Sequence, residues 1–107
     1  MNMLNQIVLV GRLVSDPTDN KITLAVNRSY KNAEGVYETD FIDIRIFGTI
    51  ASNTCEYCKK GDIIGVKGRL EGIREDDGDG HFKNETVVVA EKITFLSSRH
   101  DTDMRNV

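Results

Sequence analysis

A run of alternating residues between positions 37 and 47 most constrains what this chain can fold into. The run separates side chains by parity: Ile42, Ile44 and Ile46 on one side, and Phe41, Asp43, Arg45 and Phe47 on the other. Because successive side chains of a strand point to opposite faces, this pattern predicts an aliphatic face toward a core and a second face toward water. Aromatic rings beside a cation on a sheet surface favour stacking of nucleic-acid bases. The same rings would also fit a core or a subunit interface.

The rest of the chain predicts four further strands and one helix. In chain order, the predicted elements are strands over 5–13, 21–30 and 37–47, a helix from roughly Thr49 to Lys60, and strands over 63–70 and 86–95. The first strand contains a continuous apolar run, so we expect it to be buried on both faces. Five strands with one helix between the third and the fourth is the layout of the OB-fold. We therefore expect an all-β, five-stranded Greek-key barrel with one short helix.

Length and charge limit the protein class. The 107 residues suit one domain, which we place at residues 1–97, followed by a polar tail at 98–107. Net charge is −3, but residues 21–69 carry eight Lys/Arg against six Asp/Glu, whereas residues 70–91 carry two against seven. The central sheet is therefore mildly basic. No apolar run approaches the roughly 18 residues that span a membrane, and the sequence does not begin with a signal pattern, so we expect a cytoplasmic location.

Catalytic and metal chemistry find little support in the sequence. Cys55 and Cys58 are the only cysteines, and the two histidines, His81 and His100, lie far from them. We interpret the pair as buried thiols of the helix rather than a redox pair or half a zinc site. The acidic segment 75–80 departs from the calcium-loop motif and is interpreted as an exposed hairpin tip. These patterns predict a binding protein, not an enzyme, with no cofactor or metal.

Basic side chains supply candidates for phosphate contacts. Seven are considered: Arg12, Arg28, Lys31, Lys60, Lys67, Arg69 and Arg74. For any one of them alone, solvated surface charge is the favoured interpretation, and only clustering on one face would favour a shared site. Tyr30, beside the first hairpin turn, is a third aromatic candidate. Strict alternation would place its ring on the core side with Val26, so outward display requires a bulge or a strand end near Arg28.

Several segments together resemble a known family. The matching segments are Asn5–Leu13 followed by Asp16-Pro17, Ile22–Tyr30, Tyr37–Phe41, Phe47-Gly48, Lys59–Asp62 and Gly68–Leu70. Across residues 3–96, this combination resembles the bacterial single-stranded DNA-binding proteins. The resemblance implies an OB-fold that binds single-stranded DNA without strong sequence preference in replication, recombination or repair. It also implies a homotetramer, with a dimer as the alternative.

The resemblance assigns roles to particular residues. The stacking positions of the family fall on Tyr30, Phe41 and Phe47. Strand alternation already indicates the two phenylalanines, whereas only the resemblance assigns a stacking role to Tyr30. The phosphate contacts of the family map onto Lys31, Lys60 and Arg74, with Arg12 as a plausible addition.

The sequence departs from the family pattern in charge and in one ring. Glu75 stands where a further aromatic is common, and Asp43, Thr49 and Glu71 replace expected cations. Stacking contributes roughly 1–3 kcal/mol per base, so losing one ring lowers affinity about tenfold or more. The long Gly/Pro/Gln-rich tail of the family, with its acidic tip, has no counterpart here. Two explanations are open: a truncated sequence, or a short paralogue such as a phage or a mobile element carries. In either case tail-dependent recruitment does not transfer.

An alternative function is also consistent with the sequence. The acidic hairpin and the missing tail fit an OB-fold accessory protein, similar to the small primosome proteins. Such a protein joins replication proteins and touches DNA only weakly.

Overall fold

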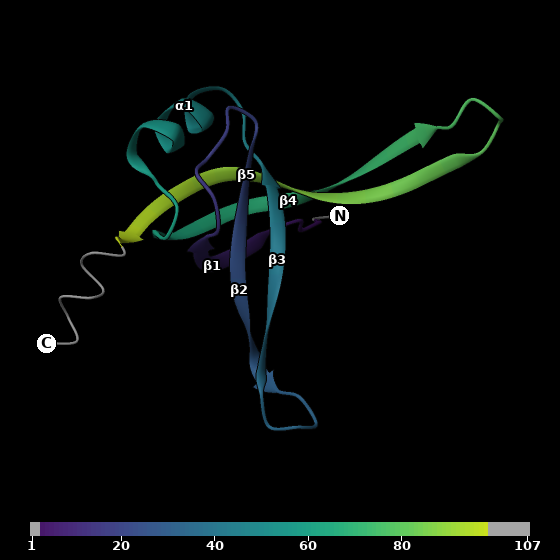
Figure 1. The fold of residues 1–107 in the computed structure, drawn as a ribbon. Coiled ribbons are helices and arrows are strands. Elements are labelled where there is room, and N and C mark those ends of the chain that lie inside the picture. Colours follow the sequence, from purple (N-terminus) through teal and green to yellow (C-terminus); the bar gives the residue numbers. More distant parts are fainter. Residues whose placement is uncertain (1–2, 99–107) are drawn as a thin grey trace, which may run out of the picture.

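The computed structural model describes residues 3–98 and shows a closed barrel (Figure 1). Its elements are β1 (Ile7–Leu13), β2 (Lys21–Lys31), β3 (Tyr37–Arg45), α1 (Gly48–Tyr57), β4 (Ile63–Asp76) and β5 (Phe82–Ser97). The strands close in the order β1-β2-β3-β5-β4, with β3 and β5 parallel and the other pairs antiparallel. This arrangement confirms the predicted five-stranded barrel with one helix between the third and fourth strands. Residues 99–107, nearly all of the predicted tail, lie outside the described residues.

The core follows the alternation of the strands. The fully buried side chains are Leu13, Ile22, Leu24, Ile44, Ile46, Ile64, Val66 and Val89. Ile22 and Leu24 of β2 occupy every second position, and so do Ile44 of β3 and Ile46 just after it, as a strand buried on one face requires. Helix α1 adds Ala51 to the same apolar cluster, and Cys58 joins it just beyond the helix.

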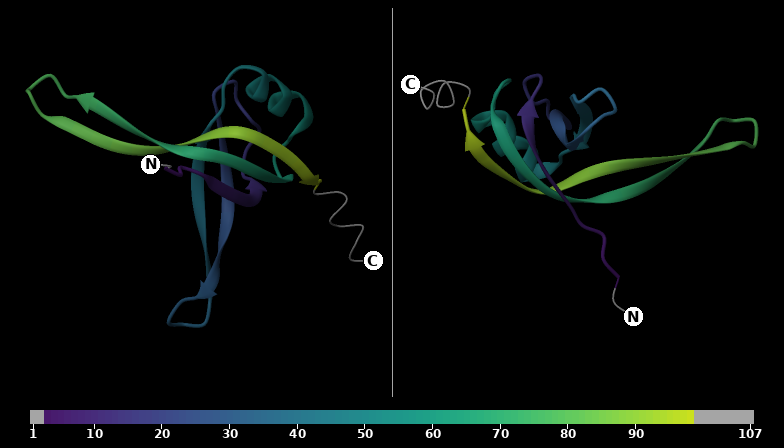
Figure 2. Two further views of the ribbon diagram at one scale, coloured as in Figure 1. Left: turned by 180° about the vertical axis from the view of Figure 1, so that it is seen from behind. Right: turned by 90° about the horizontal axis from the view of Figure 1, so that it is seen from below.

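Two hairpins extend from the barrel in different directions, as Figures 1 and 2 show. In one of them, β4 and β5 stay paired from Ile63↔Ser97 out to Asp76↔Phe82. The predicted strand boundaries at 70 and 86 were therefore wrong. Most side chains of this β4–β5 arm are exposed, so the arm carries little of the apolar periodicity that marks a half-buried strand. Backbone pairing continues there without burial.

Strand β1 corrects a second expectation. Val8 and Val10 are 65% and 53% exposed, so the strand is not buried on both faces in this chain. Its apolar run alternates between the core and the outer surface of the barrel. Gly65 of β4 lies next to this outer surface, and a Cβ atom there would stand 4.0 Å from a methyl of Val10 and 3.7 Å from one of Leu96.

The end of α1 corrects a third expectation, because the helix ends at Tyr57 rather than at Lys60. The residues that follow form a turn in which the Lys59 amide donates to Oδ2 of Asp62 at 2.8 Å. Gly61 takes a φ of 95° in that turn. The lysine and glycine signals therefore belong to the turn that leads into β4, not to the helix terminus.

Candidate nucleic-acid interface

The register of β2 against β3 builds an outward surface that we call the ring-bearing face. Its cross-strand pairs are Lys21↔Arg45, Thr23↔Asp43, Ala25↔Phe41 and Asn27↔Thr39, and Phe47 continues it beyond the strand. Phe41 and Phe47 are 69% and 56% exposed, whereas Ile44 and Ile46 are fully buried. Phe47 keeps the strand parity because its backbone is still extended, with φ −140° and ψ 157°. The predicted separation of rings from isoleucines is confirmed.

Small and polar residues surround the Phe41 ring. Its cross-strand partner is Ala25, whose methyl group leaves the ring free to stand clear of the sheet. On one side, the Thr23 hydroxyl donates to Oδ1 of Asp43 at 2.7 Å. On the other, the Thr39 hydroxyl donates to Oδ1 of Asn27 at 2.7 Å. The ring therefore lies between two pairs of hydrogen-bonding side chains, an arrangement that offers both a stacking surface and polar groups for a base edge.

Tyr30 has the backbone irregularity that the sequence required. Between Asn27↔Thr39 and Lys31↔Tyr37 the register shifts, because β2 advances four residues while β3 covers two. The Tyr30 side chain is 63% exposed. Beside it, the ammonium of Lys31 lies 5.6 Å from the centroid of the Tyr37 ring. The end of this hairpin thus carries two exposed tyrosines and a lysine.

Arg28 is already engaged by carboxylates. Its guanidinium donates to both carboxylate oxygens of Asp40 at 3.0–3.3 Å and to Glu38 at 2.6 Å. The hydrogen bond from Arg28 lowers the pKa of Asp40, and the same bond raises the pKa of Arg28. Asp40 shares the parity of Ile42, so this cluster lies on the side of the hairpin opposite the rings.

The other candidate cations are spread over the barrel. Arg69 pairs with Glu71 at 3.2 Å and with Glu91 at 3.4 Å. Arg12 donates to the carbonyl of Gly61 at 2.6 Å.

The lysines differ from these arginines. No ion pair between described residues involves Lys31, Lys60 or Lys67. Lys67 faces outward from β4, which β1 and β5 separate from the ring-bearing face. The structure therefore does not gather all seven candidates on one surface.

The β4–β5 arm carries an aromatic residue that sequence reasoning missed. Phe82 is 55% exposed, and the guanidinium of Arg74 lies 3.8 Å from its ring centroid. The resemblance placed the family's further aromatic residue at the position of Glu75. In the structure Glu75 pairs with Lys83, and Phe82 lies next to Lys83 on the facing strand. In the sequence, the one sign of this residue is that Phe82 is a single aromatic residue shortly after the acidic segment 75–80.

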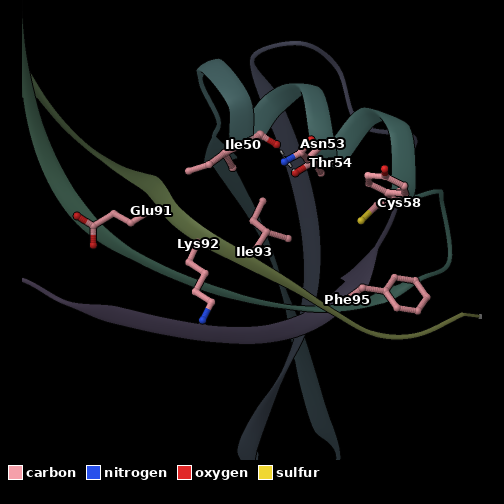
Figure 3. A pocket seen from close by; sticks show the side chains of 9 residues that line it. Ile50, Asn53, Thr54, Cys58, Glu91, Lys92, Ile93 and Phe95 are labelled. Atoms are coloured by element: carbon pink, nitrogen blue, oxygen red, sulfur yellow. Dashed lines mark hydrogen bonds between the residues drawn. The ribbon is translucent and has the colours of Figure 1, made fainter.

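A groove lies between α1 and β5 (Figure 3), and none of its lining residues belongs to the ring-bearing face. Its volume is about 390 Å³, and its lining includes Ile50, Thr54, Tyr57, Cys58, Ile93 and Phe95. Burial raises the pKa of the Cys58 thiol. Cys55 is exposed, contrary to expectation, and its thiol donates to the carbonyl of Thr18 at 3.1 Å.

Two further searches concern the described part of the chain. Within residues 3–98, no group of three or more His, Cys, Asp or Glu side chains is placed to hold a metal ion. The helix found in those residues is too short and too polar to cross a membrane.

The closed five-stranded barrel with one helix between β3 and β4 defines an OB-fold protein, a class that uses its second and third strands to bind oligonucleotides or oligosaccharides. The model of the Single-strand binding protein family matches residues 4–96, and the chain belongs to this family, which is non-catalytic. The resemblance predicted from the sequence is confirmed.

Individual relatives agree with this assignment. The chain is 37% identical over 108 residues to Single-stranded DNA-binding protein 1 of Clostridium acetobutylicum, covering 92% of this chain and 98% of the relative. It is 42% identical over 108 residues to Single-stranded DNA-binding protein 2 of Staphylococcus aureus strain COL, covering 92% and 78%. A Plasmodium falciparum SSB solved in complex with ssDNA matches with a TM-score of 0.73 at 22% identity, covering 91% and 98%. That last likeness supports the fold alone.

Proposed function

We propose that this protein binds single-stranded DNA in the cytoplasm, with broad sequence tolerance, during replication, recombination or repair. The observation that carries the proposal is the exposure of Phe41 and Phe47 on the ring-bearing face, opposite fully buried isoleucines. Bases of every kind present a π-face, so stacking on these rings tolerates any sequence. Tyr30 adds a third exposed ring on the same hairpin.

Phosphate neutralisation would come first from the cations that no carboxylate holds. Lys31, Lys60 and Lys67 have no ion pair among residues 3–98, and Arg74 contacts a ring rather than an acid. Arg28 and Arg69 would have to exchange carboxylates for phosphates, and Arg12 would contribute only the N–H groups not donated to Gly61. This ranking follows from the cost of breaking an existing charge-assisted hydrogen bond.

Oligonucleotide titration tests the stacking proposal. A labelled oligo-dT is titrated with the parent protein and with Phe41→Ala, Phe47→Ala and the control Tyr57→Ala, which removes an exposed ring beside the groove. Phe41→Ala and Phe47→Ala should each lose about five- to hundredfold in affinity, the equivalent of roughly 1–3 kcal/mol per stacked base. Tyr57→Ala should bind like the parent. Unchanged affinity in both phenylalanine variants would overturn the proposal.

Salt dependence tests the ranking of the cations. Each phosphate contact contributes a slope of about −0.7 to the plot of log affinity against log salt for a single strand. Lys31→Gln should reduce that slope, whereas Arg28→Gln should leave it nearly unchanged. The opposite result would show that Arg28 leaves its carboxylates to bind DNA.

We also propose that copies of the chain assemble, as a homotetramer or a dimer, through the outer surface of β1. Val8, Val10 and Leu96 expose apolar side chains there around Gly65. Residues 7–10 of β1 pair with β4 but not with β2, so their second edge has no strand partner among residues 3–98. Light scattering should give a multiple of the 12.0 kDa chain mass, and Val10→Asp should lower it. The control is Val36→Asp in the β2–β3 turn; a monomeric parent would contradict the assembly.

The groove between α1 and β5 favours a second candidate function, that of an accessory protein. Its apolar lining and two exposed rings, Tyr57 and Phe95, offer a contact surface for a replication protein. The titration above separates the two functions. Negligible affinity of the parent for every oligonucleotide would favour the accessory role.

A further inference from the structure

Asp43 places a carboxylate in the middle of the ring-bearing face. It lies on β3 between Phe41 and Phe47, with its side chain exposed on the same side as both rings. Thr23 is its only hydrogen-bonding or ion-pair partner among residues 3–98, and the hydroxyl binds Oδ1. The second carboxylate oxygen is therefore available to a ligand, in an orientation that the threonine fixes.

The spacing along the strand puts this carboxylate at the edge of a stacked base. Side chains two residues apart on one face of a strand are separated by roughly 6.5–7 Å. That separation is comparable with the width of a base, so a base lying on the Phe41 ring has an edge next to the Thr23–Asp43 pair. Ala25, opposite Phe41, leaves this space open.

The chemistry of a carboxylate distinguishes the four bases at this position. An ionised carboxylate only accepts hydrogen bonds, and it accepts two side by side. Guanine presents two neighbouring donors, N1–H and the N2 amino group. In adenine and cytosine the amino donor adjoins a ring-nitrogen acceptor, and in thymine the N3–H donor stands between two carbonyl oxygens. In these three bases an acceptor would face the second carboxylate oxygen and repel it.

We infer that Asp43 gives the DNA-binding face a preference for guanine, superimposed on binding that otherwise tolerates every base. The inference rests on the proposed function, because stacking on Phe41 must bring the base to the carboxylate. The Asp43 carboxylate repels the phosphates of the bound strand whichever base is present. Only guanine offsets this repulsion by donating two hydrogen bonds to the carboxylate. The Asp43 carboxylate thus distinguishes guanine from the other bases, and Thr23 acts as a positioning residue that orients Oδ1.

Competition between single-stranded oligonucleotides tests the inference. A labelled dT oligonucleotide of about 15 nucleotides, near the site size of one OB fold, is displaced by unlabelled strands of the same length. In each competitor a few separated dT positions are replaced by dG, dA, dC or deoxyinosine, and isolated substitutions avoid guanine-rich structures. The parent should bind the dG strand about fivefold tighter than the dT strand. Deoxyinosine lacks the N2 amino group and should lose most of this gain.

Two variants and one control complete the experiment. Asp43→Asn keeps the shape of the side chain but replaces one acceptor by a donor, so it should remove the preference for guanine. Thr23→Val should reduce that preference. Asp19→Asn, an equal charge change at an exposed turn residue, should retain it.

The possible failures are distinguishable. Equal affinity of the parent for the dG and dT strands, or a uniform gain for all strands in Asp43→Asn, would overturn the inference and leave the proposed function intact. Absence of binding to every strand, or no effect of Phe41→Ala, would overturn the proposed function itself.

Discussion

The guanidinium of Arg74 lies 3.8 Å from the centroid of the Phe82 ring and joins the two strands of the β4–β5 arm beyond the barrel. The two residues share a face of the arm, because Arg74 pairs with Asn84 and Phe82 lies two positions before Asn84 on β5. Both strands are exposed in this region, so the contact is among the few that hold the outer arm together besides its backbone hydrogen bonds.

Replacing Phe82 should loosen the arm without unfolding the barrel. A cation–π contact at an exposed site contributes about 0.5–1 kcal/mol. Phe82→Leu keeps an apolar side chain but loses the π-face, so hydrogen exchange of the arm amides should accelerate while global stability in urea changes by less than about 1 kcal/mol. Arg74→Gln, which removes the cation and keeps the ring, serves as the reciprocal variant. Unaltered exchange in both variants would show that backbone pairing alone orders the arm.

The ion pair of Arg28 with Asp40 should make stability depend on acidic pH. The pKa of Asp40 is lowered in the folded chain by its hydrogen bond to Arg28, so the pair stabilises the fold above the unfolded-state pKa of about 3.9. This contribution is lost as pH falls through the lower, folded pKa. Urea unfolding from neutral pH to about pH 3 should show a shallower acid decline for Asp40→Asn than for the parent.

The matched control for that experiment is Glu34→Gln, which removes an exposed carboxylate of the β2–β3 turn. It should follow the parent curve. Identical acid declines for the parent and Asp40→Asn would contradict the assigned role of the pair. Because both partners are well exposed, added salt should weaken the effect.

The two faces of the β2–β3 hairpin should separate stability from binding. Leu24 is completely buried, so Leu24→Ala should cost about 2–5 kcal/mol of unfolding free energy. Phe41 is 69% exposed, and its replacement by Ala should change stability by less than about 0.5 kcal/mol while it weakens DNA binding. Thermal unfolding of both variants checks the first part. A large loss of stability in Phe41→Ala would show that the ring is covered by protein, for example by a second copy.

The two cysteines should differ in reactivity. Burial raises the pKa of the Cys58 thiol, and this reduces its thiolate fraction near neutral pH, whereas Cys55 is exposed. A thiol reagent should therefore modify Cys55 quickly in the folded protein and Cys58 only when the protein unfolds. Cys55→Ser should abolish the fast reaction. Fast labelling that persists in this variant would show that the groove beside Cys58 opens readily.

Local periodicity was enough to predict the barrel and the central part of its ring-bearing face. Ile44 and Phe41 point to opposite faces because side chains of any strand alternate, and this holds before a partner strand is known. The position of α1 between the third and fourth strands was also predictable, because the apolar period changes there from two residues to a helical stripe. By the same alternation, an outward ring at Tyr30 required an irregularity near Arg28, and the register shift between Asn27 and Lys31 supplies it.

The features that only the tertiary structure determined depend on contacts between different strands. The pairing of Arg28 with Asp40, the carboxylate of Asp43 beside Thr23, and the contact of Arg74 with Phe82 all cross between strands, so no spacing along one strand reveals them. The exposure of Val8 depends on how the barrel closes, and the length of the β4–β5 arm depends on backbone pairing between two strands that continues beyond the barrel. An apolar run indicates which side chains tend to be buried, but only the closed fold determines which of them are covered and which cations have a carboxylate beside them.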